Sequence, residues 1–369
     1  SKEFGLICAR LGIVLIHTPV RDGASKGKIE RFFRTVRDQF LVRNLSDIRD
    51  LIKLVVAFAF LTESVGTLLL AWHWVPEYGL KAGLWHSLFH AVSAFNNAGF
   101  STFTDSLIQE AGSPLVNGAV TLMFIVGGLG FVVVSDLYRH RRWSRLAMQT
   151  KVVLLATFWL NVIATAMLLG LEWSNPATLG GLGDLFTKVQ AAWFQAVTPR
   201  TAGFNTLEIG SLTDASTLLV MLLMFIGGGS SSTASGIKIT TFVVLLLTAR
   251  AFYRNTEHPT AFGRSMTQET VIKAITVALA GVLLVVLTLF GLTITDGDHS
   301  FLDLAFETVS AFGTVGLSRG ITSDLSLPGQ FLLGLTMLLG RVGPLSVGYF
   351  LATRQAKGVR YAKGEIQIG

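Results

Sequence analysis

The amino-acid sequence predicts an all-α integral membrane protein. Hydrophobic residues make up 51% of its 369 positions and charged residues only 14%, whereas soluble domains contain roughly 25% charged residues. Its 38 glycines agree with this class, because glycine is commoner in membrane helices than in soluble ones. A third observation is a set of apolar runs that are long enough to cross a hydrocarbon core of roughly 30 Å. These runs are 52–73, 115–137, 151–171, 215–249, 271–293 and 328–352.

Three shorter amphiphilic stretches lie between the long runs, at 84–95, 184–197 and 301–312. They are too short to span a bilayer, and we expect them to be re-entrant half-helices. A polar segment with one aligned glycine follows each stretch. We call these glycine segments the first, second and third: NNAGFS (96–101), RTAGFN (200–205) and GTVGLS (313–318).

This order of elements predicts an internal repeat, with a long helix, a short helix, a glycine segment and a second long helix in each copy. The first repeat covers residues 45–145, the second 146–262 and the third 263–369 with a short C-terminus. Residues 1–44 form a basic segment that is not expected to be an independent domain.

The distribution of charge predicts the orientation in the membrane. Lysine and arginine gather after the second long helix of each repeat, as in RHRRWSR at 139–145, while the segments around the short helices are mainly acidic. The positive-inside rule then places both termini in the cytoplasm and the glycine segments toward the outside of a bacterial inner membrane. Membrane lipid is the expected surrounding. The net charge of +7 is explained by these basic clusters, so no nucleic-acid partner is expected.

Polar, glycine-containing chain at membrane depth has a chemical consequence. Backbone N–H and C=O groups cannot remain unpaired in lipid, so such segments line a protein-buried or water-filled path. Carbonyl oxygens in such a path can replace the hydration shell of a potassium ion, and glycine permits the backbone conformations that this requires. The alternative for any one segment is a turn at the membrane surface.

A second polar stretch, GGGSSSTASGIK (227–238), interrupts the fourth apolar run. A phosphate-binding loop would need GxxxxGK[ST] after a strand, and no strand pattern precedes this stretch. We interpret it as a broken helix whose loop lies across an ion path as a gate.

Two charged residues lie inside apolar runs. We expect Arg341 to reach the gate stretch or a carboxylate, since intramembrane charges face the protein interior with a partner. The alternative for Arg341 is snorkelling beside a helix break at Gly343 and Pro344. Glu63 is either a buried pairing partner or a residue near a helix end.

Five motifs in order, AFNNAGFS, PRTAGFNT, GGGSSSTASGIKITT, SAFGTVGLS and GRVGPLS, resemble the membrane subunit of the Trk/Ktr/HKT superfamily of potassium transporters. The short C-terminus, which ends in RYAKGEIQIG, looks most like the Ktr-type subunit. The resemblance covers about residues 45–369. It implies a non-enzymatic potassium translocation subunit with a pseudo-fourfold pore, a homodimer, and a cytoplasmic nucleotide-binding regulatory ring. Potassium would be the transported ion, with sodium as a possible coupling ion in symport, and no covalent cofactor is expected.

The resemblance also implies site residues. The selectivity-filter residues would be Asn97, Ala98, Gly99, Phe100, Thr201, Ala202, Gly203, Phe204, Thr314, Val315, Gly316 and Leu317, which would bind potassium through backbone carbonyls. The gate residues would be Gly227, Gly228, Gly229, Ser230, Ser231, Ser232, Thr233, Gly236, Lys238 and Arg341.

The sequence departs from the family pattern at its beginning. Family members have four repeats, whereas three are present here and the unit expected before residue 45 is missing. Residues 10–41 instead resemble the end of a DDE transposase or integrase core, with Glu30 as the last metal ligand. Nuclease activity is not expected, because two further carboxylates are needed. An amphipathic basic helix is the alternative for residues 26–37. The alternative function is a non-conducting, truncated fusion product.

Overall fold

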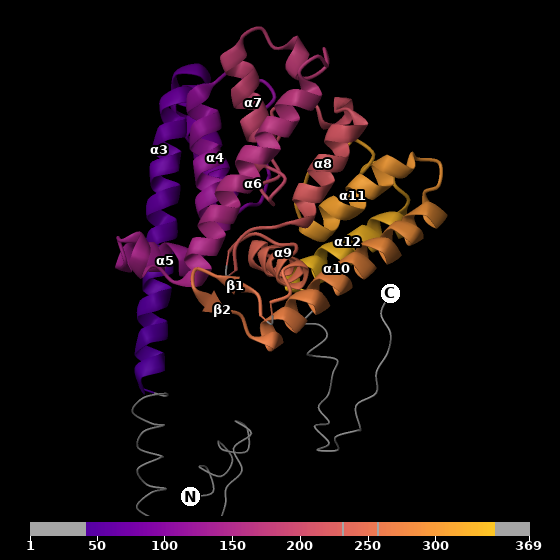
Figure 1. Cartoon of the computed structure of the whole chain (residues 1–369). Helices are drawn as coiled ribbons and strands as arrows, with labels where there is room; N and C mark the ends of the chain where they lie inside the picture. The colour runs from indigo at the N-terminus through magenta and orange to yellow at the C-terminus, as the bar shows by residue number, and fades with distance from the viewer. Residues whose placement is uncertain (1–41, 231, 257, 344–369) are drawn as a thin grey trace, which may run out of the picture. The chain divides into compact units, whose positions relative to one another are not determined.

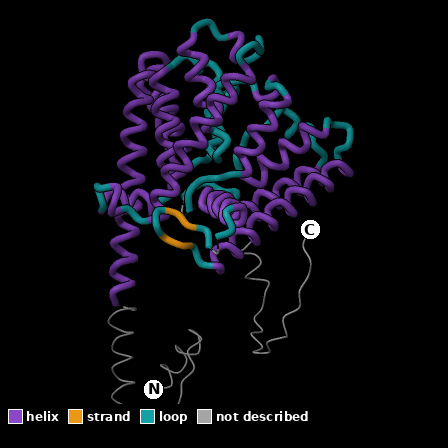
Figure 2. The backbone as a smooth tube through the Cα atoms, in the orientation of Figure 1, coloured by secondary structure: helices purple, strands orange, loops and turns teal. Residues whose placement is uncertain are grey.

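The computed structural model describes residues 42–230, 232–256 and 258–343. Its contacts divide the chain into two parts, Ser1–Phe60 and Leu61–Gly369, and the sites discussed below lie in the second. Almost every described element is a helix, with a single short hairpin in the described chain (Figure 2). The α-helices are α3 (Val42–Phe95), α4 (Pro114–Leu129), α5 (Phe131–Arg139), α6 (Met148–Glu172), α7 (Leu185–Val197), α8 (Asp214–Phe225), α9 (Ile239–Tyr253), α10 (Gln268–Thr295), α11 (Phe301–Gly313) and α12 (Leu327–Val342).

The remaining elements are short. The 3-10 turns are η2 (Trp143–Arg145), η3 (Leu179–Gly181) and η4 (Ile209–Ser211). Strands β1 (Thr260–Ala261) and β2 (Arg264–Ser265) pair antiparallel. The two residues between the strands, Phe262 and Gly263, have φ of 49° and 72°, as a tight hairpin turn requires.

Three of the described helices are long and apolar enough to cross a membrane: the Ile52–Phe95 part of α3, then α6 and α10. The pair α4 and α5 counts as a fourth if it is taken as one broken span, with a bend of 92° between them. The apolar run predicted over 115–137 is therefore helical but sharply bent. The bend lies at Gly130, whose φ of 91° and ψ of 143° end α4, a conformation that glycine adopts at little cost.

Two helix breaks that the sequence predicts are present in the structure. A non-helical Gly79 (φ 81°, ψ 165°), three residues after Pro76, separates the long and short helical parts of α3. The fourth apolar run divides into α8 and α9 around the stretch 227–238, as expected. The sixth run ends as a helix at Val342 with Gly343 in a positive-φ conformation, and its predicted continuation to residue 352 lies outside the described residues.

The short helices pack between repeats. α7 contacts α4 of the preceding repeat as well as α6 of its own, and α11 contacts α8 as well as α10 and α12 (Figure 1). The α8–α11 contact is a buried apolar cluster that includes Val220, Met224, Phe306, Val315 and Leu317. The ends of α7 and α11, where the second and third glycine segments begin, are consequently fixed by neighbours from two repeats.

A fully buried carboxylate fixes the end of α6. Glu172 Oε1 accepts hydrogen bonds from the Thr213 amide (2.9 Å) and hydroxyl (2.7 Å), and Oε2 accepts from Asn175 Nδ2 (2.7 Å) and Thr178 Oγ1 (2.6 Å). Thr213 is the N-cap of α8, so this one side chain joins α6 to α8.

We expect Glu172→Ala to lower the free energy of unfolding by about 2 kcal/mol. Thr178 is the buried donor that loses its acceptor, Asn175 is half-buried and Thr213 is exposed, and a buried donor left unsatisfied costs about 1–3 kcal/mol. Thermal unfolding in detergent micelles measures the change. Glu208→Ala, at an exposed position in the same region, is the control and should change the value by less than about 0.5 kcal/mol. Equal losses in the two variants would contradict this account of Glu172.

Candidate functional site

The three glycine segments share one backbone pattern. In each, the glycine and the residue two positions before it have positive φ, whereas the residue between them does not. Left-handed conformations are uncommon for residues with a Cβ, so three repeats of the pair are a specific signature. The pairs are Asn97 and Gly99 (51° and 73°), Thr201 and Gly203 (77° and 81°), and Thr314 and Gly316 (46° and 89°).

The three segments meet at their glycines. A Cβ placed on Gly99 would lie 2.7 Å from the Ala202 carbonyl oxygen and 2.8 Å from the Gly203 Cα. A Cβ placed on Gly203 would overlap the Val315 carbonyl oxygen and lie 3.0 Å from the Gly99 Cα. The carbonyls that precede the second and third glycines therefore point at the neighbouring segment, and an alanine has no room at either Gly99 or Gly203.

Each segment is folded back onto its short helix by hydrogen bonds. The amides of Ala98, Ala202 and Val315, each directly before the glycine, donate to a carbonyl near the helix end at 2.9 Å. Two hydroxyls also hold the residue after the glycine: Ser93 Oγ donates to the Phe100 carbonyl (2.8 Å) and Thr198 Oγ1 to the Phe204 carbonyl (2.5 Å). These bonds fix the pattern without using the carbonyl of the residue directly before each glycine.

In the first and second segments, the residue three positions before the glycine attaches the segment to the long helix that precedes it. In the first repeat Asn96 Nδ2 donates to Glu63 Oε1 at 2.9 Å. Glu63 therefore has a partner and does not lie at a helix end, but it is half-buried and Asn96 is exposed, so this is not the buried pair of the first alternative. In the second, the buried guanidinium of Arg200 donates to Asn161 Oδ1 at 3.0 Å and to Thr157 Oγ1 at 3.3 Å. This attachment could not be predicted from the sequence, because Asn96 and Arg200 differ in type.

The stretch 227–238 is a compact turn with little space beside its glycines. The Gly227 amide donates to the Ile237 carbonyl (2.8 Å), and the Gly229 amide donates to the Gly128 carbonyl of α4 (2.7 Å). A Cβ on Gly228 would lie 2.6 Å from both the Ala234 Cβ and the Gly128 carbonyl oxygen. The turn therefore packs directly on the end of α4.

Side-chain hydrogen bonds also stabilise this turn. Ser232 Oγ donates to the Gly229 carbonyl (2.6 Å), Lys238 Nζ donates to the Ala234 carbonyl (2.5 Å), and the hydroxyls of Ser230 and Thr240 are 2.9 Å apart. Gly236 has a φ of 70°. Ser231, also a predicted gate residue, lies outside the described residues.

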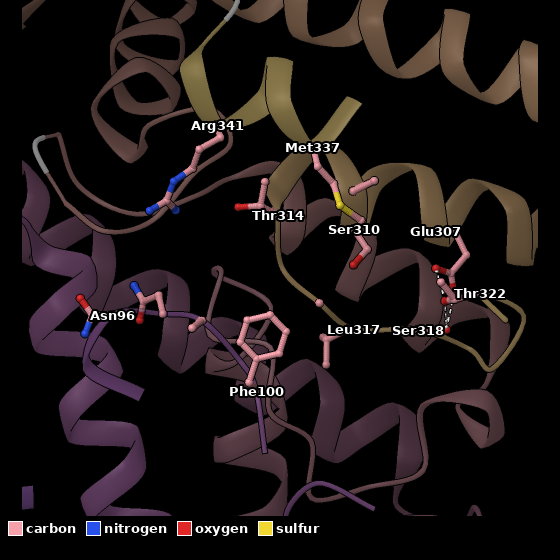
Figure 3. A pocket seen from close by; sticks show the side chains of 14 residues that line it. Asn96, Phe100, Glu307, Ser310, Thr314, Leu317, Ser318, Thr322, Met337 and Arg341 are labelled. Carbon is pink, nitrogen blue, oxygen red and sulfur yellow. Dashed lines mark hydrogen bonds between the residues drawn. The ribbon is translucent and has the colours of Figure 1, made fainter. Parts of the chain in front are cut away.

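Arg341 reaches this turn from α12. Its NH1 donates to the Thr233 carbonyl (2.6 Å) and to Ser235 Oγ (3.0 Å), and Figure 3 shows the guanidinium directed at the loop. Of the two alternatives for Arg341, the structure has the contact with the gate stretch. When the Asn97 amide is oriented to satisfy its neighbours, its oxygen accepts from Thr233 Oγ1 at 3.2 Å, so Thr233 lies between Arg341 and the first glycine segment.

A cavity of about 550 Å³ adjoins the glycine segments (Figure 3). It opens between the first and third segments, and no residue of the second segment lines it. Phe100 faces this cavity with 69% of its surface exposed, whereas the aligned Phe204 and Leu317 are 0% and 3% exposed. The first segment is thus the one that lacks a covering neighbour among the described residues.

A polar network holds the chain directly after the third glycine segment. The buried Glu307 accepts from Ser318 Oγ (2.5 Å), Thr322 Oγ1 (2.9 Å) and the Arg319 amide (3.2 Å). Arg319 Nε donates to Asp303 (2.6 Å), and its NH1 donates to Thr217 of α8 (2.6 Å). The acidic residues that the sequence indicated only as a charged surface therefore include two that position this segment.

Comparison with known proteins identifies the family. The family model described as TrkH, cation transport protein, matches residues 34–360. The chain belongs to this family. The TrkH family assignment confirms the family resemblance drawn from the motifs, and it is a family of transporters, not of enzymes.

The names of similar proteins agree with this family assignment. The "Ktr system potassium uptake protein B" of Bacillus subtilis (strain 168) is 44% identical over 86% of this chain and 71% of the relative. The protein of the same name from Vibrio alginolyticus is 38% identical over 88% of this chain and 71% of the relative. The "Potassium/sodium uptake protein NtpJ" of Enterococcus hirae is 35% identical over 94% and 78%.

A solved structure shows the same fold. The potassium transporter TrkH from Vibrio parahaemolyticus superposes with a TM-score of 0.68 at 18% sequence identity, over 83% of this chain and 65% of that one. The chain is therefore an all-α membrane protein of the TrkH fold. These comparisons give no support to the transposase resemblance of residues 10–41 or to a truncated fusion product. Glu30 and its neighbours lie outside the described residues.

Proposed function

We propose that this chain is the pore-forming membrane subunit of a Ktr-type potassium uptake system. The observation that carries the proposal is the convergence of three glycine segments with one backbone pattern, whose carbonyls at Ala202 and Val315 point at the neighbouring segment. Such carbonyls can take the place of water around a potassium ion. The names of the relatives with 44% and 38% identity support potassium as the ion.

In this proposal the glycine segments are the selectivity filter, and the three repeats 45–145, 146–262 and 263–369 surround it. A fourth helix–loop–helix unit completes the ring. The packing supports this, because the second and third glycine segments each contact the repeat before them. The ring centroids of Phe204 and of His90 in the first repeat are 6.0 Å apart. Leu317 belongs to an apolar cluster with Val220 of the second repeat. Phe100 is exposed, and a preceding unit would cover it in the same way.

The stretch 227–238 is the proposed gate, with Arg341 holding it closed. The turn lies against α4 through Gly229 and against the first filter segment through Thr233 and Asn97. Movement of the turn would therefore change the inner side of the filter. Release of the two hydrogen bonds from Arg341 is the step that we assign to opening.

Orientation and partners follow the charge pattern and the relatives. Both termini are proposed to face the cytoplasm of a bacterial cell, where a nucleotide-binding ring of regulatory subunits would contact a homodimer of this chain. The name "Ktr system" for two relatives supports a multi-component assembly. Sodium as a coupling ion is supported only by the name of the relative from Enterococcus hirae.

Rubidium uptake in cells without their own potassium importers tests the proposal. The chain is compared with a version in which residues 1–44 are replaced by the first repeat of a complete relative, and membrane insertion of both is checked by immunoblotting. We expect uptake in the repaired version and little in the chain alone. Equal uptake by both would contradict the need for a fourth unit, and no uptake by either inserted protein would contradict the proposed function.

A further inference from the structure

Three potential metal ligands meet away from the filter, at the end of the long part of α3. His73 and Glu77 lie one helical turn apart, directly before the helix break at Gly79. Glu110 belongs to the turn that leads into α4. One ligand atom from each of the three side chains lies within 4.8 Å of the others, and His73 Nε2 is 3.0 Å from Glu110 Oε2.

Glu110 is held in place by groups that are not ligands. Its Oε1 accepts a 2.7 Å hydrogen bond from Nε1 of Trp74, a side chain that is fully buried. Its backbone carbonyl accepts from Asn117 Nδ2 at 2.8 Å. Carboxylates that bind metals are commonly oriented by such outer hydrogen bonds, so Oε2 is presented to His73 in a fixed direction.

Solvent can reach the cluster. Glu110 lines a cavity of about 310 Å³ together with Tyr78, Asp105 and Gln109. The side chains of His73 and Glu110 are 33% and 12% exposed, and Glu77 is exposed. An ion can therefore reach His73 and Glu77 from solvent, and Glu110 from solvent or from this cavity.

The donor set determines the class of ion. One imidazole nitrogen, two carboxylate oxygens and a water form the tetrahedral set that Zn²⁺ accepts, whereas K⁺, Mg²⁺ and Ca²⁺ prefer oxygen ligands alone. We propose that His73, Glu77 and Glu110 bind a divalent transition-metal ion of the zinc class. The ion is not cargo of the filter, and the proposal does not depend on the chain conducting potassium.

The described chain contains a second histidine–carboxylate pair that serves as a matched control. His140 Nδ1 lies 2.9 Å from Asp136 Oδ1 at the basic end of α5, but no third ligand joins them among the described residues. If any exposed His–carboxylate pair were enough to bind zinc, substitution at His140 would matter as much as substitution at His73.

A bound ion would also have a structural effect. It would join the end of α3 to the segment 102–113, which follows the first glycine segment. At the start of that segment Thr102 Oγ1 already lies 2.7 Å from His86 Nδ1, and Oγ of Ser101, the last residue of the first glycine segment, lies 2.9 Å from His90 Nε2. The site would thus add a cross-link at a place where side chains of α3 contact the chain leaving the first glycine segment.

Isothermal titration of the purified, tag-free and EDTA-treated full chain with ZnCl₂ in detergent tests the proposal. We expect one saturable site, weakened at least about tenfold in His73→Gln and in Glu77→Gln, and unchanged within twofold in His140→Gln. Gln at position 73 can still donate to Glu110, and Glu77 is exposed, so both variants should fold; thermal unfolding without metal checks this.

X-ray absorption at the zinc edge gives a second readout. We expect nitrogen and oxygen ligands at about 2.0–2.2 Å with no sulfur, since a sulfur signal would indicate Cys8, the single cysteine of the chain. Absence of saturable binding, equal affinity of the wild type and both folded variants, or sulfur ligation would each overturn the proposal.

Discussion

A Gly203→Ala variant is expected to lose at least about tenfold in rubidium uptake, measured in the repaired chain with four repeats. Gly203 has a φ of 81°, and a left-handed conformation costs a residue with a Cβ about 1–2 kcal/mol. The new Cβ would also overlap the Val315 carbonyl oxygen, one of the oxygens proposed to contact the ion. A displaced filter carbonyl changes ion coordination, so the potassium-over-sodium preference should fall as well.

Gly170→Ala is the matched control for this substitution. Gly170 lies in α6, and a Cβ placed there has no neighbour within 4 Å. Alanine also has a higher helix propensity than glycine. This variant should keep wild-type uptake and selectivity. If Gly203→Ala reached the membrane and retained normal uptake and selectivity, the assignment of the second glycine segment to the filter would be wrong.

Arg341→Gln is expected to raise basal rubidium uptake in the same background without regulatory subunits. A hydrogen bond to a charged group contributes roughly 1.5–3 kcal/mol, and Arg341 makes two with the gate stretch, to Thr233 and Ser235. We expect these bonds to form in the closed state and not in the open state. Losing them then shifts the closed–open equilibrium toward the open state by at least about tenfold, since about 1.4 kcal/mol corresponds to a factor of ten.

Arg264→Gln provides the control for charge. Arg264 is exposed in strand β2, remote in sequence from the gate, and its substitution should leave uptake unchanged. Uptake would be measured as initial rates at several rubidium concentrations, so that a change in the number of open pores is separated from a change in affinity. Lower or unchanged uptake in Arg341→Gln would contradict the view that Arg341 holds the gate closed.

The three aligned glycine segments could be predicted from the sequence because they depend on local chemistry. Each glycine segment needs a residue without a Cβ at a left-handed position, and glycine is the residue that allows this at low cost. Gly99, Gly203 and Gly316 are therefore visible as aligned glycines after short amphiphilic helices. The break at 227–238 was predictable for the same reason, since a run of small polar residues cannot continue an apolar helix.

Other features depend on tertiary contacts and could not be predicted. The left-handed conformations at Asn97, Thr201 and Thr314 belong to two residue types, neither of them glycine, and are imposed by the hydrogen bonds that fold each segment back. The attachment of Arg200 to α6 requires knowing that Asn161 faces it. The bend at Gly130 was hidden because the sequence on both sides remains apolar.

The three glycine segments share a backbone but are anchored by different groups. In the first segment the Asn96 side-chain amide donates a hydrogen bond to the Glu63 carboxylate of α3. In the second segment the Arg200 guanidinium donates to Asn161 of α6. The third has Gly313 at the aligned position, where a Cβ would lie 2.8 Å from the Met224 carbonyl oxygen, so close packing takes the place of a side-chain anchor. After duplication of an ancestral unit, each copy could therefore exchange its anchor without altering the others. Selection can in this way adjust one glycine segment at a time while the shared backbone pattern persists.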